Sequence, residues 1–125
     1  MNAWSPNTAT LPNLQPIGAS QTNVPISKKF PITAGGSKNI VISVTVSAVT
    51  GTPDLIFRTS IGTGTPVVAK TVSVSAGANN YYIKLNSDVD TTAGVLPLLS
   101  LGEVVATTIA GQALTVTAVQ TLQEE

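Results

Sequence analysis

The sequence predicts an all-β protein: a small antiparallel β-sandwich or jelly-roll-like barrel with an extended N-terminal arm. Three observations indicate this fold class. Short apolar segments alternate with polar residues at the two-residue period of a strand, Gly and Pro separate them at short intervals, and helical periodicity is lacking. At 125 residues the chain is long enough for one domain. We expect the arm at residues 1–23 and the sandwich at residues 24–125.

The first 27 residues hold no charged side chain but contain the only tryptophan. They show no strand alternation and have too little apolar mass for a core, so as a free tail they would be disordered. We therefore expect the arm to lie along a partner surface, with Trp4 as its main anchor and Leu11, Leu14 and Ile17 as further contacts. The alternative is that Trp4 folds back onto its own sandwich.

The sandwich is expected to begin with a weak edge strand at residues 24–32, because Pro25 and Pro31 cannot donate ladder hydrogen bonds. The strongest strand pattern runs from Asn39 to Thr50, where one face is mostly hydroxylated and the other is apolar. The apolar face consists of Ile40, Ile42, Val44, Val46 and Ala48.

Further strands are predicted around residues 55–57 and over 67–75. In the next strand Tyr81 shares a face with Ile83 and Leu85. Tyr82 and Lys84 point the other way, so we expect Tyr81 in the core and Tyr82 at a rim or interface.

Residues 88–101 are ambiguous: the start suits a short helical turn, but Pro97 excludes a long helix. The last two strands, at residues 103–109 and 114–120, are separated by the tight turn Ala110-Gly111-Gln112. This spacing predicts a β-hairpin.

Catalysis is disfavoured by composition, since the chain has no His and no Cys. The commonest general base, the commonest metal ligand and the thiol nucleophile are therefore excluded. No serine lies in a G-x-S-x-G nucleophile elbow. We expect no enzyme, no catalytic residues and no cofactor.

One acidic pattern, Asn86-x-Asp88-x-Asp90, has the spacing that begins a calcium loop. A complete EF-hand loop would need Gly at the position of Thr91 and Glu at the position of Pro97. Because Asn and Asp also favour turns, we expect no metal site here. A looser cation site shared between loops or subunits remains the alternative.

The number and distribution of charged side chains limit the kinds of partner that we expect. Six cationic and six anionic side chains make up 10% of the chain, and the cations are scattered. A nucleic-acid partner is not expected, because it would need a basic face. No long apolar run predicts a membrane span, and no basic-then-apolar N-terminus predicts a signal peptide. Low charge suits a permanent protein contact, although Ser, Thr and Asn could instead provide the solvation.

Two stretches carry a family resemblance: KNIVISVTVSAVTGTPDLI at 38–56 and VLPLLSLGEVVATTIAGQALTVTAVQ at 95–120. Together with the arm and the Val/Thr/Ser/Ala-rich, Cys-free composition, they resemble the decoration (cement) proteins of tailed-bacteriophage capsids. The resemblance implies a homo-oligomer, dimer or trimer, on the outside of the virion capsid, assembled in the host cytoplasm. There it would staple neighbouring subunits of the major capsid protein.

Two other functions stay open. A carbohydrate-binding sandwich, on a virion or secreted, predicts a concave aromatic surface with polar groups beside it. Tyr81 and Tyr82 cannot form such a platform together, because adjacent strand residues point to opposite faces. A self-tiling shell or tail subunit predicts spontaneous assembly of the purified chain.

Overall fold

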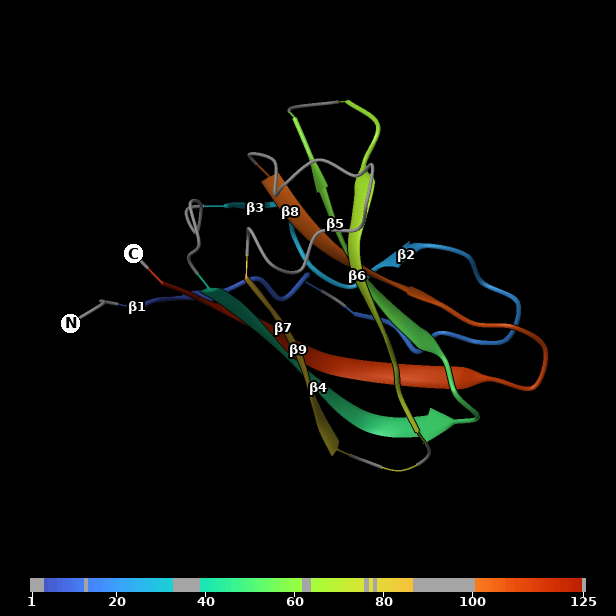
Figure 1. The fold of residues 1–125 in the computed structure, drawn as a ribbon. Helices are drawn as coiled ribbons and strands as arrows, with labels where there is room; N and C mark the ends of the chain where they lie inside the picture. The colour runs from blue at the N-terminus through green and yellow to red at the C-terminus, as the bar shows by residue number, and fades with distance from the viewer. Residues whose placement is uncertain are drawn as a thin grey trace.

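The computed structural model describes residues 4–12, 14–32, 39–61, 64–75, 77, 79–86 and 101–124. These residues form strands, bends and turns, and none belongs to a helix that could cross a membrane. The strands (Figure 1) are β1 (Trp4–Thr8), β2 (Val24–Pro25), β3 (Phe30–Pro31), β4 (Asn39–Thr50), β5 (Asp54–Ser60), β6 (Val67–Ser73), β7 (Asn79–Asn86), β8 (Leu101–Thr107) and β9 (Ala113–Glu124).

Two antiparallel sheets form the sandwich, as predicted. One sheet has the order β1-β9-β4-β7 and the other β2-β8-β5-β6, with β3 also paired to β8. Because β2 and β3 pair with different parts of β8, they act as one interrupted edge strand. Counted so, each sheet has four strands, and the chain passes between the sheets in the order of a jelly roll. The edge position predicted from Pro25 and Pro31 is confirmed.

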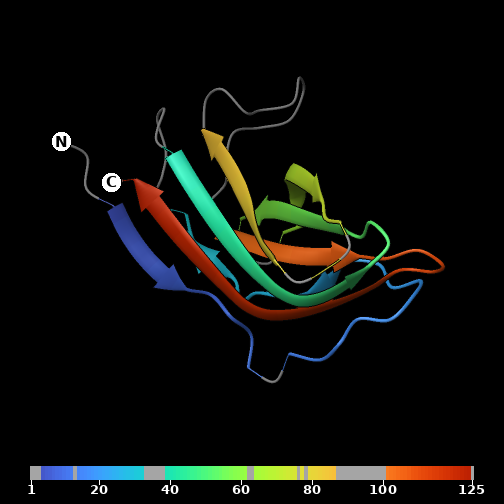
Figure 2. The ribbon, with the colours of Figure 1, turned by 90° about the horizontal axis from the view of Figure 1, so that it is seen from below.

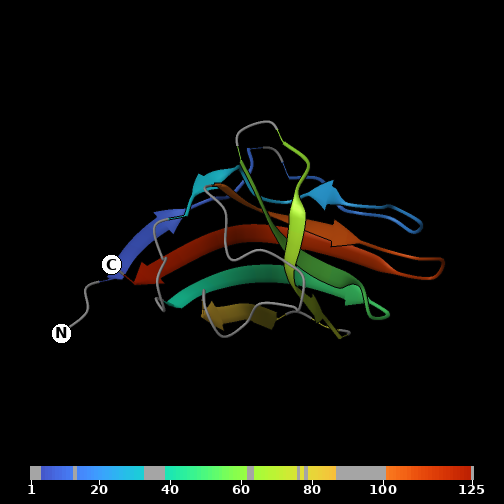
Figure 3. The same cartoon turned by 45° about the horizontal axis from the view of Figure 1, so that its top comes forward.

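The long strands β4 and β9 curve around the second sheet (Figures 2 and 3). Their pairing shifts register at Thr45/Val46 and at Val46/Ala48, and such bulges bend a strand. The predicted strand at 39–50 is confirmed. Beyond the bulges the inward face changes, so that Val49 is buried and Ala48, expected on the apolar face, is exposed.

The core lies between the sheets. The apolar face of β4 meets Leu55 and Phe57 of β5 and Val104 of β8, all of which are fully buried. Phe30 of β3 stacks on Phe57 with ring centroids 6.1 Å apart and planes 7° apart. The interrupted edge strand thus contributes an aromatic side chain to the core.

The predicted hairpin near the C-terminus is wrong. A tight turn does form, because the Gln112 amide donates to the Ile109 carbonyl at 3.2 Å. However, β8 and β9 belong to different sheets, so the turn is a corner of the sandwich. The N-terminal segment occupies the backbone groups beside this corner: the Ile17 amide donates to the Leu114 carbonyl at 2.7 Å, and the Ser20 amide to the Ile109 carbonyl at 3.3 Å.

The described part of the arm lies on its own sandwich, which corrects the expectation of a strap ordered by a partner. β1 pairs with β9 over five residues. Residues 9 and 10 then cross between the sheets: the Ala9 amide donates to the Val119 carbonyl at 2.9 Å, and the Lys28 amide donates to the Ala9 carbonyl at 2.8 Å. The arm is ordered by backbone hydrogen bonds, which need neither apolar mass nor strand alternation.

Candidate binding surface

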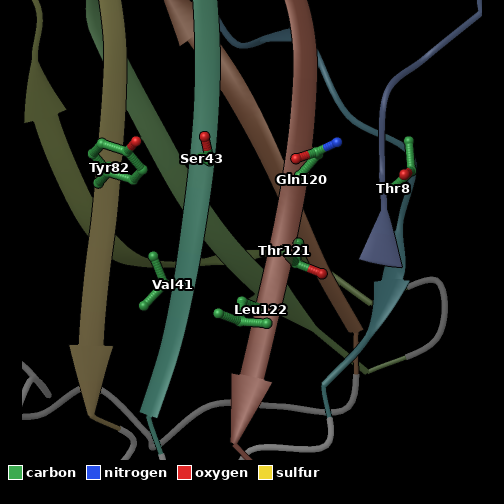
Figure 4. A pocket seen from close by; sticks show the side chains of 7 residues that line it. All are labelled: Thr8, Val41, Ser43, Tyr82, Gln120, Thr121 and Leu122. Carbon is green, nitrogen blue, oxygen red and sulfur yellow. The ribbon is translucent and has the colours of Figure 1, made fainter. Parts of the chain in front are cut away.

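Four side chains form a row across the outer face of the β1-β9-β4-β7 sheet. Tyr82 of β7 pairs in register with Ser43 of β4, Ser43 with Gln120 of β9, and Gln120 with Thr8 of β1. These four residues are termed the Tyr82 row, and Figure 4 shows their side chains. Ile42, next to Ser43, is fully buried, so strand alternation directs the row outward.

The Tyr82 row and two aliphatic neighbours line a hollow of about 590 Å³. Val41 and Leu122 pair with each other two residues further along β4 and β9, on the same face. Tyr82 is 52% exposed and Leu122 is 38% exposed. Among the described residues, the outer lining thus combines one aromatic ring with hydroxyl, amide and aliphatic groups and includes no Asp, Glu, Lys or Arg.

Thr121 also lines this hollow, between Gln120 and Leu122 in β9. It alternates toward the interior and is 2% exposed. Its hydroxyl has no hydrogen-bond partner among the described residues. Thr121 therefore has an inward, buried hydroxyl and is not a member of the row.

Lys84 lies beside the row and holds Tyr82. Its Nζ is 5.7 Å from the centre of the Tyr82 ring, a cation–π contact. The Lys84 carbonyl accepts a hydrogen bond of 2.6 Å from the Lys70 ammonium of β6, which links the two sheets at this edge. Tyr82 has the exposed position expected from the sequence, whereas Tyr81 is half-buried against the core. A binding role for Tyr82 stays a prediction.

Leu11 and Leu14, both predicted as partner contacts, line a smaller groove of about 270 Å³. The groove lies between this part of the arm and β2, and its walls include Pro12, Pro16 and Pro25. Both leucines are half-buried, and Leu14 packs against the core. Their contact with a partner stays a prediction.

Ile17 is mainly a core residue. Its side chain is 6% exposed and belongs to the core. It also lines the groove of Leu11 and Leu14, so its contact with a partner stays a prediction. Its backbone forms a β-bridge with Leu114, so the side chain turns inward at the sheet corner. For Trp4, the backbone pairs with Glu124 in the β1–β9 ladder, and the side chain lies outside the described part of the structure.

One ion pair was not predicted from the sequence. Arg58 of β5 and Glu103 of β8 are cross-strand neighbours, and Arg58 Nε and Nη2 both donate to Glu103 Oε1, at 2.9 and 2.6 Å. The side chains are 21% and 13% exposed. Only the strand register, across 45 positions of sequence, brings them together. The pair neutralises both charges and joins two strands, which is a structural role.

No group of three or more His, Cys, Asp or Glu residues gathers in the described part of the chain. The side chains of the Asn86-x-Asp88-x-Asp90 pattern lie outside that part. The sequence matches no protein-family model, and comparison with curated proteins finds no significant match. A functional assignment therefore depends on architecture and surface chemistry.

Proposed function

We propose that this protein is a structural virion protein that decorates the outer surface of a capsid and binds the major capsid protein in many copies. The observation that carries the proposal is the jelly-roll strand order of the two sheets. Viral capsid domains and lectins are prominent users of this fold. Since one fold serves several functions, the strand order supports the proposal only in combination with surface and composition.

Composition supports a permanent contact. Charged residues are 10% of the chain, against about 25% in ordinary soluble domains, and the net charge is zero. A surface of this kind has little electrostatic repulsion to oppose association. In a subunit fixed on a shell as a dimer or trimer, which is what the phage resemblance implies, association is the function.

The groove of Leu11 and Leu14 is the attachment surface in this proposal. Because the arm lies on its own sandwich, it would act as part of a preformed surface and not as a free strap. The prolines at 12, 16 and 25 and the hydrogen bonds to β8 and β9 hold the groove walls before binding. Less conformational entropy is then lost on docking. An apolar side chain of the major capsid protein suits this groove.

The test is sedimentation of the purified chain with capsids of its own virus that were prepared without it. We expect the wild-type chain to sediment with the capsids, and the Leu11→Asp variant to stay in the supernatant, because a carboxylate cannot be buried in an apolar groove. Ile61→Asp is the matched control. Ile61 follows β5 directly, is 65% exposed, and is not among the residues that line the groove.

Three outcomes separate the possibilities. Failure of the wild-type chain to sediment would overturn the decoration role. Binding of Leu11→Asp at wild-type level would keep that role but overturn the groove as its site. Ordered particles formed by the purified chain alone would instead support the self-tiling subunit.

A further inference from the structure

We infer that the hollow on the Tyr82 row is a binding site for a neutral saccharide. This site goes beyond the capsid attachment proposed above, because it uses a different surface. The Leu11–Leu14 groove lies between the arm and β2, whereas the Tyr82 row crosses β7, β4, β9 and β1. The two lining sets have no residue in common.

The size and the polar groups of the hollow suit a small ligand. Its volume of about 590 Å³ lies within the usual range for ligand sites. The hydroxyls of Ser43 and Thr8 can each donate and accept, and the Gln120 amide offers both functions at separate atoms. Ligand hydroxyls, which also donate and accept, match this set.

The Tyr82 ring provides an aromatic surface on which a sugar can pack. A pyranose has a face of C–H groups and a rim of hydroxyls, so it can pack on an aromatic ring while its rim forms hydrogen bonds. At 52% exposure part of the Tyr82 ring surface is accessible for such packing, beside the Lys84 Nζ that lies over the ring. The aliphatic side chains of Val41 and Leu122 extend the apolar surface beside it.

Charge selects a neutral ligand. A phosphate, sulfate or nucleic acid would need paired cations at the site. The described lining residues include none. Lys84, the cross-strand partner of Val41, is the one cation described beside them, and its Nζ lies over the Tyr82 ring at 5.7 Å.

The row is also arranged before binding. Its four members stand on adjacent strands in continuous register, so strand spacings of ~4.8 Å give a length of ~14 Å from Tyr82 to Thr8. This length suits a short oligosaccharide better than one sugar ring. Because the sheet fixes the backbone positions of these side chains, less entropy is lost on binding, which favours recognition.

The test is a glycan array probed with the full chain, with neutral glucans, mannans, galactans and xylans in one set and sialylated and sulfated glycans in the other. We expect binding within the neutral set. The strongest neutral oligosaccharide is then titrated by calorimetry against the wild type and three variants. Tyr82→Ala should weaken binding by about tenfold or more through loss of the ring, and Tyr82→Phe by no more than about threefold. Gln120→Ala should weaken binding by about tenfold through a lost hydrogen bond.

Ile109→Ala is the control, because Ile109 is 64% exposed at the turn between β8 and β9, is not among the residues that line the hollow, and should leave binding unchanged. Urea denaturation checks that every variant remains folded. The inference is overturned if no neutral glycan binds, if only acidic glycans bind, or if folded Tyr82→Ala binds like the wild type. Capsid sedimentation of Tyr82→Ala should stay at wild-type level, so the two proposals fail separately.

Discussion

The Thr10 side chain forms two hydrogen bonds with the Val119 backbone, one as acceptor and one as donor. The Val119 amide donates to Thr10 Oγ1 at 3.0 Å, and the Thr10 hydroxyl donates to the Val119 carbonyl at 3.2 Å. The β1–β9 ladder ends at Thr8, and the Thr10 backbone already bridges to Ser27 beside the other sheet. The hydroxyl thus replaces a backbone partner where the arm leaves one sheet for the other.

Thr10→Val should therefore loosen the arm. The buried Val119 amide would lose its acceptor, and we expect the free energy of unfolding to fall by about 1–2 kcal/mol. Hydrogen exchange measured by NMR should show faster exchange of the Val119 amide. Thr71→Val, on the exposed face of β6, is the control and should change neither quantity appreciably. Unchanged exchange at Val119 in Thr10→Val would contradict this role of the hydroxyl.

The stability of an Ile17 variant tests whether this side chain acts in the core. With 6% exposure and a place in the core cluster, its truncation should leave a cavity. We expect Ile17→Ala to lower the free energy of unfolding by about 2–4 kcal/mol in urea denaturation of the isolated chain. Ile109→Ala removes the same atoms from a side chain that is 64% exposed and should change stability by less than about 0.5 kcal/mol. Equal stability of the two variants would contradict the core role of Ile17.

Local patterns predicted the strands well but not their neighbours. The alternation from Asn39 to Thr50 sets both the strand and its inner face as far as Val46, because side-chain direction depends only on the backbone period. Pro25 and Pro31 place their segment at an edge for an equally local reason. The turn at 110–112 is also local, but whether it joins paired strands or two sheets depends on what else competes for their backbone groups.

The arm and the Tyr82 row show why the rest could not be predicted. Residues 4–9 gain order from backbone groups of β9, and apart from the missing donor of proline a backbone hydrogen bond has no signature in residue type. Tyr82 could be assigned to the outer face from alternation alone. Its neighbours Ser43, Gln120 and Thr8 come from distant parts of the chain and meet only through register, which the sequence does not specify locally.

Gly102 of β8 is required by the aromatic stack beside it. A Cβ at this position would lie 2.8 Å from Phe30 Cε2, Phe57 Cε1 and Ile32 Cδ1. Gly102→Ala should therefore push the stacked rings apart and lower the free energy of unfolding by about 1–3 kcal/mol. Gly18→Ala is the matched control, since no atom lies within 4 Å of its added Cβ, and it should change stability by less than about 0.5 kcal/mol. Urea denaturation of both variants checks the difference, and equal midpoints would contradict the tight packing.

Two threonines of equal burial should respond to the same substitution with opposite signs. Thr121 and Thr108 are each 2% exposed. The Thr121 hydroxyl has no partner among the described residues, whereas the Thr108 hydroxyl accepts from the Gln21 amide at 3.0 Å and donates to the Gly18 carbonyl at 2.6 Å. Valine keeps the volume and removes the hydroxyl, so its effect depends on the hydrogen bonds that the hydroxyl makes.

Thr121→Val should raise the free energy of unfolding by about 1 kcal/mol, because a desolvated and unsatisfied group is replaced by a methyl group. Thr108→Val should lower it by about 2 kcal/mol, because the Gln21 amide and the Gly18 carbonyl both lose their partner. Thermal and urea denaturation of the two variants measure the signs directly. A loss of stability in Thr121→Val as large as that in Thr108→Val would mean that the Thr121 hydroxyl is hydrogen-bonded in the folded protein.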